Sequence, residues 1–423
     1  MTQHYRVLAL VLLTFATPQV SAESLAAAIK LARPGWSIES LVEEATLVGD
    51  ERPISLLDGR LRTRVRSTRD VQVWTVDEGD FLQVHLGVLA APINCLFHAD
   101  PGYTALLVSE LSNNAIKAVL EEEKAQLDSK EVRTWTLDHV GIRPVLFVYW
   151  KFKIVTSDGN KKNRFLKTAV SLVDDTLVSC THAQHGNAPN FLAVFSHLIQ
   201  NAKVSSATQK PFFQELSVMR SDGLPTRFFR TRYFATEKDG VKVATDVGNL
   251  WASSTKIAVM DSREMQQGSV SGELLRQSYA AHYDGVTIAD LELYPIDDRT
   301  WVVDGSYARE PLSASLESDT LLYTASKTVS LMKEMISDPT KDTVELQTWL
   351  PILEPTKLYD MKIEQIDDSR SARYTIDGTS MRIELAMDGT IERMHGRVEG
   401  IEGLPSVDTE IVRVATEGQM PAD

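Results

Sequence analysis

Residues 144–156 read PVLFVYWKFKIVT, residues 163–173 read NRFLKTAVSLV, and residues 176–182 read TLVSCTH. All three runs are rich in β-branched and aromatic residues, which favour strands. Asp158-Gly159 separates the first two runs, and both residues tolerate the positive φ angles that hairpin turns require. We therefore expect consecutive antiparallel strands, preceded by a further strand at 131–138.

Two amphipathic segments flank these strands. Residues 104–127 place Leu107 and Leu111 on one side of a predicted helix and three consecutive glutamates on the other. A second predicted helix opens at Pro189 and carries a stripe of apolar residues that begins at Phe191. The order helix, four strands, helix in residues 104–202 resembles the topology of the PsbP/Mog1-type sandwich, which implies a sheet packed against helices.

The rest of the chain repeats the same mixture of periodicities. Residues 60–88 alternate polar and apolar positions in three short runs, which predicts an antiparallel meander. The second half has one predicted helix, at 319–337. Its predicted strands lie at 226–235, 241–247, 286–294, 300–307, 343–349, 357–366, 371–377, 380–387 and 390–398. We predict an α+β protein of two domains, each a mainly antiparallel sheet packed with amphipathic helices.

The chain begins with the features of a cleavable export signal. One basic residue, Arg6, precedes an apolar run from Val7 to Ala16, and small residues before Glu23 place the predicted cleavage after Ala22. Ten apolar residues are too few to span a bilayer, and no later stretch is apolar enough to do so. The sequence predicts a periplasmic or secreted protein with no transmembrane segment after cleavage.

Composition suggests where the mature chain divides. The small, polar, proline-terminated stretch Ser205–Pro211 is typical of a linker. We predict an N-terminal domain over 23–204, a linker over 205–212, a C-terminal domain over 213–416 and a flexible tail over 417–423. Lysines and arginines number 20 against 22 acidic residues in 23–204, and 23 against 36 in 205–423, so the second domain is strongly acidic. An acidic surface repels phosphate backbones, which argues against a nucleic acid partner.

The two cysteines, Cys95 and Cys180, form an even pair in a chain with an export signal, which predicts a disulfide. The alternative is a metal site, because His98, His182 and His185 lie within five residues of these cysteines and zinc prefers thiolate and imidazole ligands. Disulfide formation and thiolate ligation exclude each other.

A run of alternating arginines is the second candidate site. Arg60, Arg62, Arg64 and Arg66 fall on one face of a strand whose other face carries Leu61, Thr63 and Val65. Such a ladder suits phosphate, carboxylate or anionic lipid head groups, because arginine pairs planar anions bidentately. The alternative is a solvated edge strand whose charge prevents aggregation.

Motifs of common enzymes and cofactor sites are absent from the sequence, including G-x-S-x-G, G-x-G-x-x-G, Walker A, H-E-x-x-H and the EF-hand loop. No cofactor is therefore expected. We predict a non-enzymatic module that binds a ligand or a protein partner in the cell envelope. The alternatives are a hydrolase whose site is assembled from distant residues and a metal-binding protein that uses the cysteines and histidines named above.

Overall fold

The computed structural model describes residues 38–43, 45, 49–76, 79–85, 89, 91–98, 104–205, 210–236, 240–252, 255–338, 340–366, 370–398 and 407–420. Within these ranges the chain forms 24 strands and four helices. The predicted α+β class, with its PsbP/Mog1-like first domain, is therefore wrong: the protein is mostly β, with large antiparallel sheets. The predicted signal peptide and residues 206–209 of the predicted linker lie outside the described residues.

The chain divides into two compact units. Among the described residues, the N-terminal unit contains those up to Ser205 together with 248–259, and the C-terminal unit contains 210–247 and those from 260 onward. In the described part of the chain, no helix is long and apolar enough to cross a membrane.

A small three-stranded sheet opens the N-terminal unit. Strands β1 (Asp50–Leu56) and β2 (Leu61–Ser67) form an antiparallel hairpin, and β10 (Lys203–Val204) pairs with the other edge of β2. The hairpin turn depends on three consecutive positive φ angles at Leu57, Asp58 and Gly59. This sheet brings two residues from the far end of the unit beside β2.

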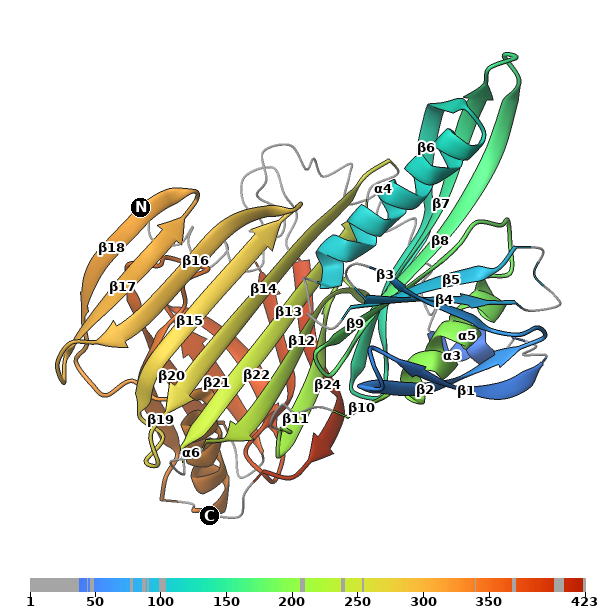
Figure 1. Cartoon of the computed structure of the whole chain (residues 1–423). Helices are drawn as coiled ribbons and strands as arrows, with labels where there is room; N and C mark the ends of the chain where they lie inside the picture. Colours follow the sequence, from blue (N-terminus) through green and yellow to red (C-terminus); the bar gives the residue numbers. More distant parts are fainter. Residues whose placement is uncertain are drawn as a thin grey trace. The chain divides into compact units, whose positions relative to one another are not determined.

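A seven-stranded antiparallel sheet forms the rest of this unit (Figure 1). After β5 the chain crosses to the far edge of the sheet and returns strand by strand until β9 pairs with β5. In sheet order the strands are β3 (Gln72–Val76), β4 (Gly79–Val84), β5 (Ile93–His98), β9 (Thr176–His182), β8 (Lys161–Val173), β7 (Arg143–Thr156) and β6 (Ala125–Val140).

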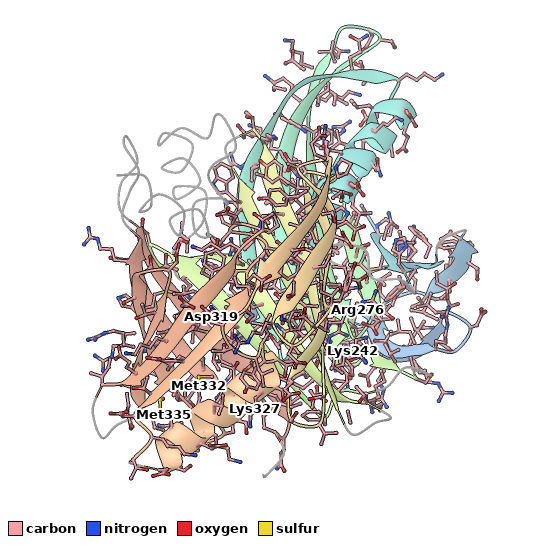
Figure 2. The ribbon with its side chains drawn as sticks, turned by 90° about the vertical axis from the view of Figure 1, so that its left-hand side faces the viewer. Lys242, Arg276, Asp319, Lys327, Met332 and Met335 are labelled. Carbon is pink, nitrogen blue, oxygen red and sulfur yellow. A yellow bond between two sulfur atoms is a disulfide. The ribbon has the colours of Figure 1, made fainter. Side chains whose placement is uncertain are left out.

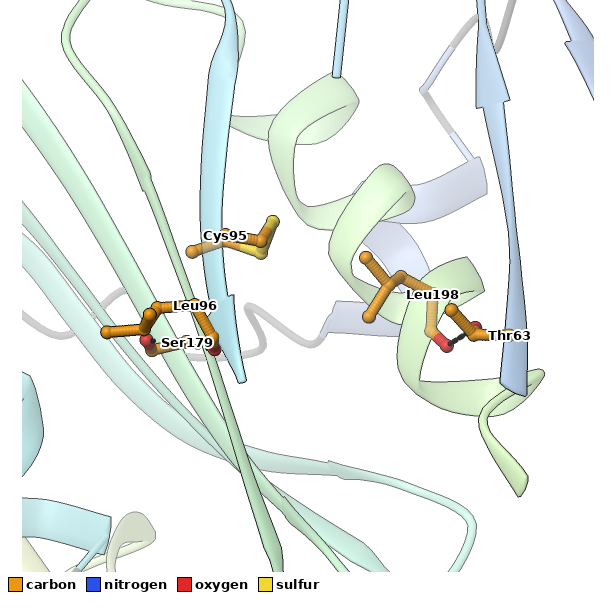
Figure 3. Close-up of a disulfide and its surroundings, with 6 residues drawn as sticks. Thr63, Cys95, Leu96, Ser179 and Leu198 are labelled. Carbon is orange, nitrogen blue, oxygen red and sulfur yellow. Dashed lines mark hydrogen bonds between the residues drawn. A yellow bond between two sulfur atoms is a disulfide. The ribbon is translucent and has the colours of Figure 1, made fainter. Parts of the chain in front are cut away.

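In the described part of the N-terminal unit there are three helices: α3 (Ile38–Glu43), α4 (Thr104–Glu122) and α5 (Ala188–Gln200). The predicted helix at 104–127 is too long, because Lys124 adopts a φ of 48° and β6 starts directly after it. The apolar stripe predicted for the second helix is buried, and the Thr63 hydroxyl on β2 donates a 2.6 Å hydrogen bond to the carbonyl oxygen of Leu198 (Figure 3). Helix α5 therefore packs against the small sheet.

One fourteen-stranded antiparallel sheet makes up most of the C-terminal unit. It consists of two meanders, β11–β18 and β19–β24, joined where β11 pairs with β24. The strands are β11 (Phe213–Ser221), β12 (Leu224–Ala235), β13 (Val241–Ala252), β14 (Ile257–Gly268), β15 (Leu274–Tyr283), β16 (Val286–Pro295), β17 (Thr300–Tyr307), β18 (Glu310–Glu317), β19 (Thr343–Trp349), β20 (Leu358–Gln365), β21 (Ser371–Ile376), β22 (Thr379–Leu385), β23 (Ile391–Val398) and β24 (Val407–Gly418).

Helix α6 (Ala325–Ser337) packs against the second meander. Thr324 caps its N-terminus by accepting a hydrogen bond from the Lys327 amide, and the side chains of Met332 and Met335 are buried in a core with β19–β22 (Figure 2). A Cβ atom added at Gly389 would lie 2.3 Å from the carbonyl oxygen of Val329, so the helix rests directly on the turn between β22 and β23.

The error in fold class arose from strands that the sequence pattern did not reveal. Eight were missed: β1, β5 and β10 in the N-terminal unit, and β11, β14, β15, β18 and β24 in the C-terminal unit. In β14 the apolar pattern is interrupted by charged residues, yet Asp261 is buried and Arg263 donates a 2.7 Å hydrogen bond to Asp246 on β13. Asp246 also accepts a 2.9 Å bond from Arg232 on β12. Charged residues such as these lead a hydrophobicity pattern to predict a loop. In the structure they lie in strands, because ion pairs with neighbouring strands neutralise them.

Candidate functional site

The predicted disulfide is confirmed. Cys95 on β5 and Cys180 on β9 are direct partners in the antiparallel ladder, with Cα atoms 4.0 Å apart, and their sulfur atoms are bonded (Figure 3). Both residues are fully buried in the core of the N-terminal unit. Because a disulfide sulfur carries no thiolate, neither cysteine is available as a zinc ligand in this state.

The three histidines near the cysteines take separate positions. His98 points to the opposite face of β5 from Cys95. His182 stacks on Phe191 with ring centroids 6.1 Å apart, and His185 packs edge-on against Phe165 at 4.3 Å. Among the described residues, no group of three or more His, Cys, Asp or Glu side chains could hold a metal ion. His182 and His185 therefore pack against aromatic rings, and they do not form a metal site with the cysteines.

The arginine ladder lies where strand alternation places it. The residues between the arginines are buried on β2, and Arg62, Arg64 and Arg66 are exposed on the other face of the small sheet, while Arg60 is exposed in the turn just before β2. β2 is the central strand of this sheet, because β1 and β10 pair with its two edges. β10 pairs only with Leu61 and Arg62, so the strand is central at this end, and Arg62 is the arginine that faces residues of both neighbours.

The strongest feature of this face is a pair of like charges. Lys203 on β10 lies directly opposite Arg62 on β2, and neither side chain makes an ion pair with any residue that the structure describes. Side chains in such cross-strand positions have Cβ atoms about 4.5–5.5 Å apart, and two like charges there are destabilising. An anion between the two groups would remove this repulsion.

A hollow of about 560 Å³ opens beside the pair. Strands β1, β2 and β10 and the residue that follows α5 all contribute to it. Its lining includes Pro53, Ser55, Arg62, Arg64, Asn201 and Lys203. The hollow therefore combines three cations with a hydroxyl, a carboxamide and an apolar ring.

One carboxylate partly neutralises the other end of the ladder. Glu51 on β1 lies 3.4 Å from the guanidinium of Arg64 and 3.3 Å from Nε2 of His197 on α5. Burial lowers the pKa of His197 below its usual value, Arg66 acts in the same direction, and Glu51 opposes both. Arg64 is therefore partly neutralised, whereas Arg62 and Lys203 bring uncompensated positive charge to the hollow.

Sequence reasoning found the arginines but missed Lys203, Asn201 and Ser55. β10 is only two residues long, so no alternation could mark it as a strand. Asn201 gives no periodic signal either, because it follows the last residue of α5. The available signal was a single lysine between an amphipathic helix and a polar linker, which does not identify a binding residue.

A second group missed by sequence reasoning surrounds Lys167, a fully buried lysine on β8. Its ammonium nitrogen lies 4.9 Å from the centre of the Tyr149 ring and donates a hydrogen bond to the carbonyl oxygen of Gln184. The Tyr149 hydroxyl accepts a 2.9 Å bond from the Gly186 amide. Burial lowers the pKa of Lys167 to about 7. The signal in the sequence was a lysine inside an apolar run.

Its cross-strand partner, His182, is also buried, and burial together with Lys167 lowers the pKa of His182 to about 4. At neutral pH the histidine is therefore uncharged. A strongly perturbed amine is a mark of many functional sites. Here no surface of Lys167 is exposed, so the group holds the loop before α5 and offers no access to a ligand.

The C-terminal unit buries two carboxyl groups with raised pKa values. Burial raises the pKa of Glu215 to about 7 against the opposing charge of Arg413, whose guanidinium lies 3.9 Å away. Burial likewise raises the pKa of Glu264 to about 7, while Gln266 and Gln277 donate hydrogen bonds of 2.7 and 3.0 Å to its Oε1. Both carboxyls are thus partly protonated at neutral pH.

Comparison with known proteins gives distant structural likeness alone. No protein-family model and no curated protein matches the chain. A β-barrel-like protein of the domain of unknown function DUF1849 from Brucella abortus is 10% identical, with a TM-score of 0.35, and the match covers 50% of this chain and 99% of that one. A DUF1089 family protein from Pseudomonas aeruginosa is 10% identical, with a TM-score of 0.22 and 45% and 93% coverage. A Bacteroides thetaiotaomicron protein is 11% identical, with a TM-score of 0.22 and 40% and 52% coverage. None of these similarities supports a conclusion about function.

Proposed function

We propose that this protein is a non-enzymatic binding protein of the cell envelope and that its N-terminal unit holds an anionic ligand in the hollow beside β2. The observation that carries the proposal is the cross-strand pair Arg62 and Lys203, two exposed like charges with no carboxylate partner among the described residues. A chain gains nothing for folding from such a pair, because like charges in directly opposite positions are destabilising. An anion bound between them receives charge-assisted hydrogen bonds from both.

The cysteines and the first residues support the proposed compartment. A disulfide joins Cys95 and Cys180, and disulfides persist in oxidising compartments and are rare in the cytosol. Together with the predicted cleavage after Ala22, this supports export to the periplasm or beyond. Nucleic acid is an unsuitable ligand there, and the net charge of −14 would repel it.

Calorimetric titration of the mature protein with phosphate and with sulfate tests the proposal. We expect saturable binding that weakens when salt rises from about 50 to about 500 mM, because exposed charges are screened. Arg62→Gln and Lys203→Gln should each weaken binding about 10-fold, since each removes a charge-assisted hydrogen bond. Arg69→Gln is the matched control, because Arg69 follows the ladder but does not line the hollow.

Two results would contradict the proposal. The first is wild-type protein that binds neither anion, or that binds both as tightly in the Arg62→Gln and Lys203→Gln variants as in the Arg69→Gln control. The second is reproducible turnover in screens with ester, peptide and glycoside substrates, which would make the protein an enzyme. Native mass spectrometry of periplasmic protein completes the test, because a zinc ion bound to each chain would favour a metal-binding role.

A further inference from the structure

The hollow is much larger than a bare anion needs. Its volume of about 560 Å³ lies in the range of about 300–1,000 Å³ that is typical of pockets for small organic ligands. One water molecule takes up about 30 Å³ in the liquid. Inorganic phosphate has only five heavy atoms, so it fills only a small part of the hollow. An ion held between Arg62 and Lys203 would leave most of the hollow to another part of the same ligand.

The charges favour a dianion over a carboxylate. Arg62, Arg64 and Lys203 bring three positive charges to the hollow, and Glu51, paired with Arg64, brings one negative charge. The site therefore lacks about two negative charges. A phosphate monoester carries about −1.5 to −2 at pH 7 and has three acceptor oxygens, whereas a carboxylate carries −1 and has two. Three cations from two strands suit three oxygens.

The uncharged lining favours a hydroxylated body. The Asn201 side chain donates through Nδ2 to the carbonyl oxygen of His197 at 2.8 Å, which leaves its Oδ1 as an acceptor. Ser55 is exposed directly opposite Arg62 on β1, and its hydroxyl can donate as well as accept. Pro53 adds an exposed apolar ring next to these polar groups. The hydroxyl groups of a compact ring would bond to Asn201 and Ser55, and its carbon atoms would pack against Pro53.

We propose that the ligand is a phosphate monoester of a polyhydroxylated ring, either a free sugar phosphate or the same chemistry on a lipid headgroup. This inference rests on the proposed anion-binding function. Arg62, Lys203 and Arg64 hold the phosphate, and Asn201 and Ser55 hold the hydroxyls of the ring. The phosphate supplies affinity, and the ring supplies selectivity.

Calorimetry of the full mature protein with glucose 1-phosphate, inorganic phosphate, glucuronate and glucose tests the inference. We expect glucose 1-phosphate to bind at least about 10-fold more tightly than inorganic phosphate or glucuronate, and glucose to bind too weakly to measure, because each loses one of the two sets of contacts. Arg62→Gln should weaken both phosphate ligands alike. Asn201→Ala and Ser55→Ala should weaken glucose 1-phosphate and leave inorganic phosphate unchanged.

Asn201→Ala could weaken binding by destabilising the end of α5. Ser55→Ala provides an independent test, because Ser55 is exposed on a strand and its loss should not disturb the fold. Sedimentation with phosphatidylcholine vesicles, with and without phosphatidylinositol 4-phosphate, distinguishes a free sugar phosphate from a lipid headgroup as the ligand. Co-sedimentation that requires the phosphoinositide indicates the lipid headgroup, and binding of glucose 1-phosphate without co-sedimentation indicates the free ester.

The inference fails if inorganic phosphate binds as tightly as glucose 1-phosphate, or if the Ser55 and Asn201 variants do not distinguish the two. The proposed anion-binding function survives that result as long as Arg62→Gln still weakens phosphate. Wild-type protein that binds no phosphate compound at all overturns both.

Discussion

Lys167 on β8 donates a hydrogen bond from its buried ammonium group to the carbonyl oxygen of Gln184, in the loop that leads into α5. Tyr149 on β7 completes the arrangement, because its ring faces the ammonium and its hydroxyl accepts the amide of Gly186. Side chains of two neighbouring strands thus fix one loop. The stability of this loop depends on a group that titrates near neutral pH.

The free energy of unfolding should rise with pH above neutrality because of Lys167. Its pKa is lowered from 10.5 to about 7, so between these values the unfolded chain binds a proton that the folded chain does not. Stability then increases with pH, by up to about 1.4 kcal/mol per unit. Urea unfolding at several pH values measures this slope. Lys167→Met should reduce the slope and raise stability below about pH 7, and an unchanged slope would show that the lysine stays charged in the fold.

Glu215 should act in the opposite direction and in a lower pH window. Its pKa is raised from 4.5 to about 7, so between these values the folded chain holds a proton that the unfolded chain releases. This contribution to stability is present at low pH and is lost as the pH rises towards 7. Glu215→Gln should reduce the fall by up to about 1.4 kcal/mol per unit.

Lys167→Met serves as the control for the Glu215 experiment, because the two groups lie in different units and titrate in different windows. Wild-type protein and the Lys167→Met variant should show the same fall in stability between about pH 5 and pH 7. A Glu215→Gln variant that keeps the full fall would assign it to another carboxyl, with Glu264 as the next candidate because burial raises its pKa in the same way.

Loss of the disulfide should destabilise the N-terminal unit. The bond closes a loop with a sequence separation of 85 residues, for which the loop-entropy model gives about 4.5 kcal/mol. The double variant Cys95→Ala/Cys180→Ala should therefore unfold at lower urea, and reduction of the wild-type protein should have a similar effect. The slope assigned to Glu215 should persist in this variant. A double variant as stable as wild type would show that the bond adds nothing to the strand pairing.

Arg62→Gln should stabilise the protein when no anion is present. The substitution removes the repulsion between Arg62 and Lys203, worth about 0.2–1 kcal/mol for a cross-strand pair. Added phosphate should reverse the order, because a ligand that binds only the folded state stabilises the wild-type protein more than the variant. Thermal unfolding with and without phosphate measures both effects. A variant that is less stable under both conditions would show that Arg62 has a structural role.

The elements that could be predicted were those whose pattern is local. A short stretch of sequence was enough to predict the strands at 144–156 and 163–173 and the apolar stripe of α5. The structure has strands and a helix at these places. β14 could not be found in this way, because its charges are neutralised by residues of other strands. The fold class was wrong because the missed strands, β14 among them, all add to the sheets.

The residues of the candidate site also fall into two groups, those that a local pattern predicts and those that only tertiary contacts bring together. The exposed face of Arg62, Arg64 and Arg66 follows from alternation alone. Lys203 and Asn201 could not be added to it, because they come from a two-residue strand and from the end of a helix. Their position beside β2 depends on α5 packing against the small sheet, partly through the hydrogen bond from Thr63 to Leu198.

By itself the sequence determined that any internal disulfide would join Cys95 to Cys180, because a chain with two cysteines has one way to form such a bridge. It also determined the alternating face of β2, because neighbouring side chains on a strand point in opposite directions. Tertiary structure alone decided that the ladder meets Lys203, that Lys167 is buried and that charged runs become strands. Those outcomes depend on contacts between residues far apart in the chain, which no local pattern records.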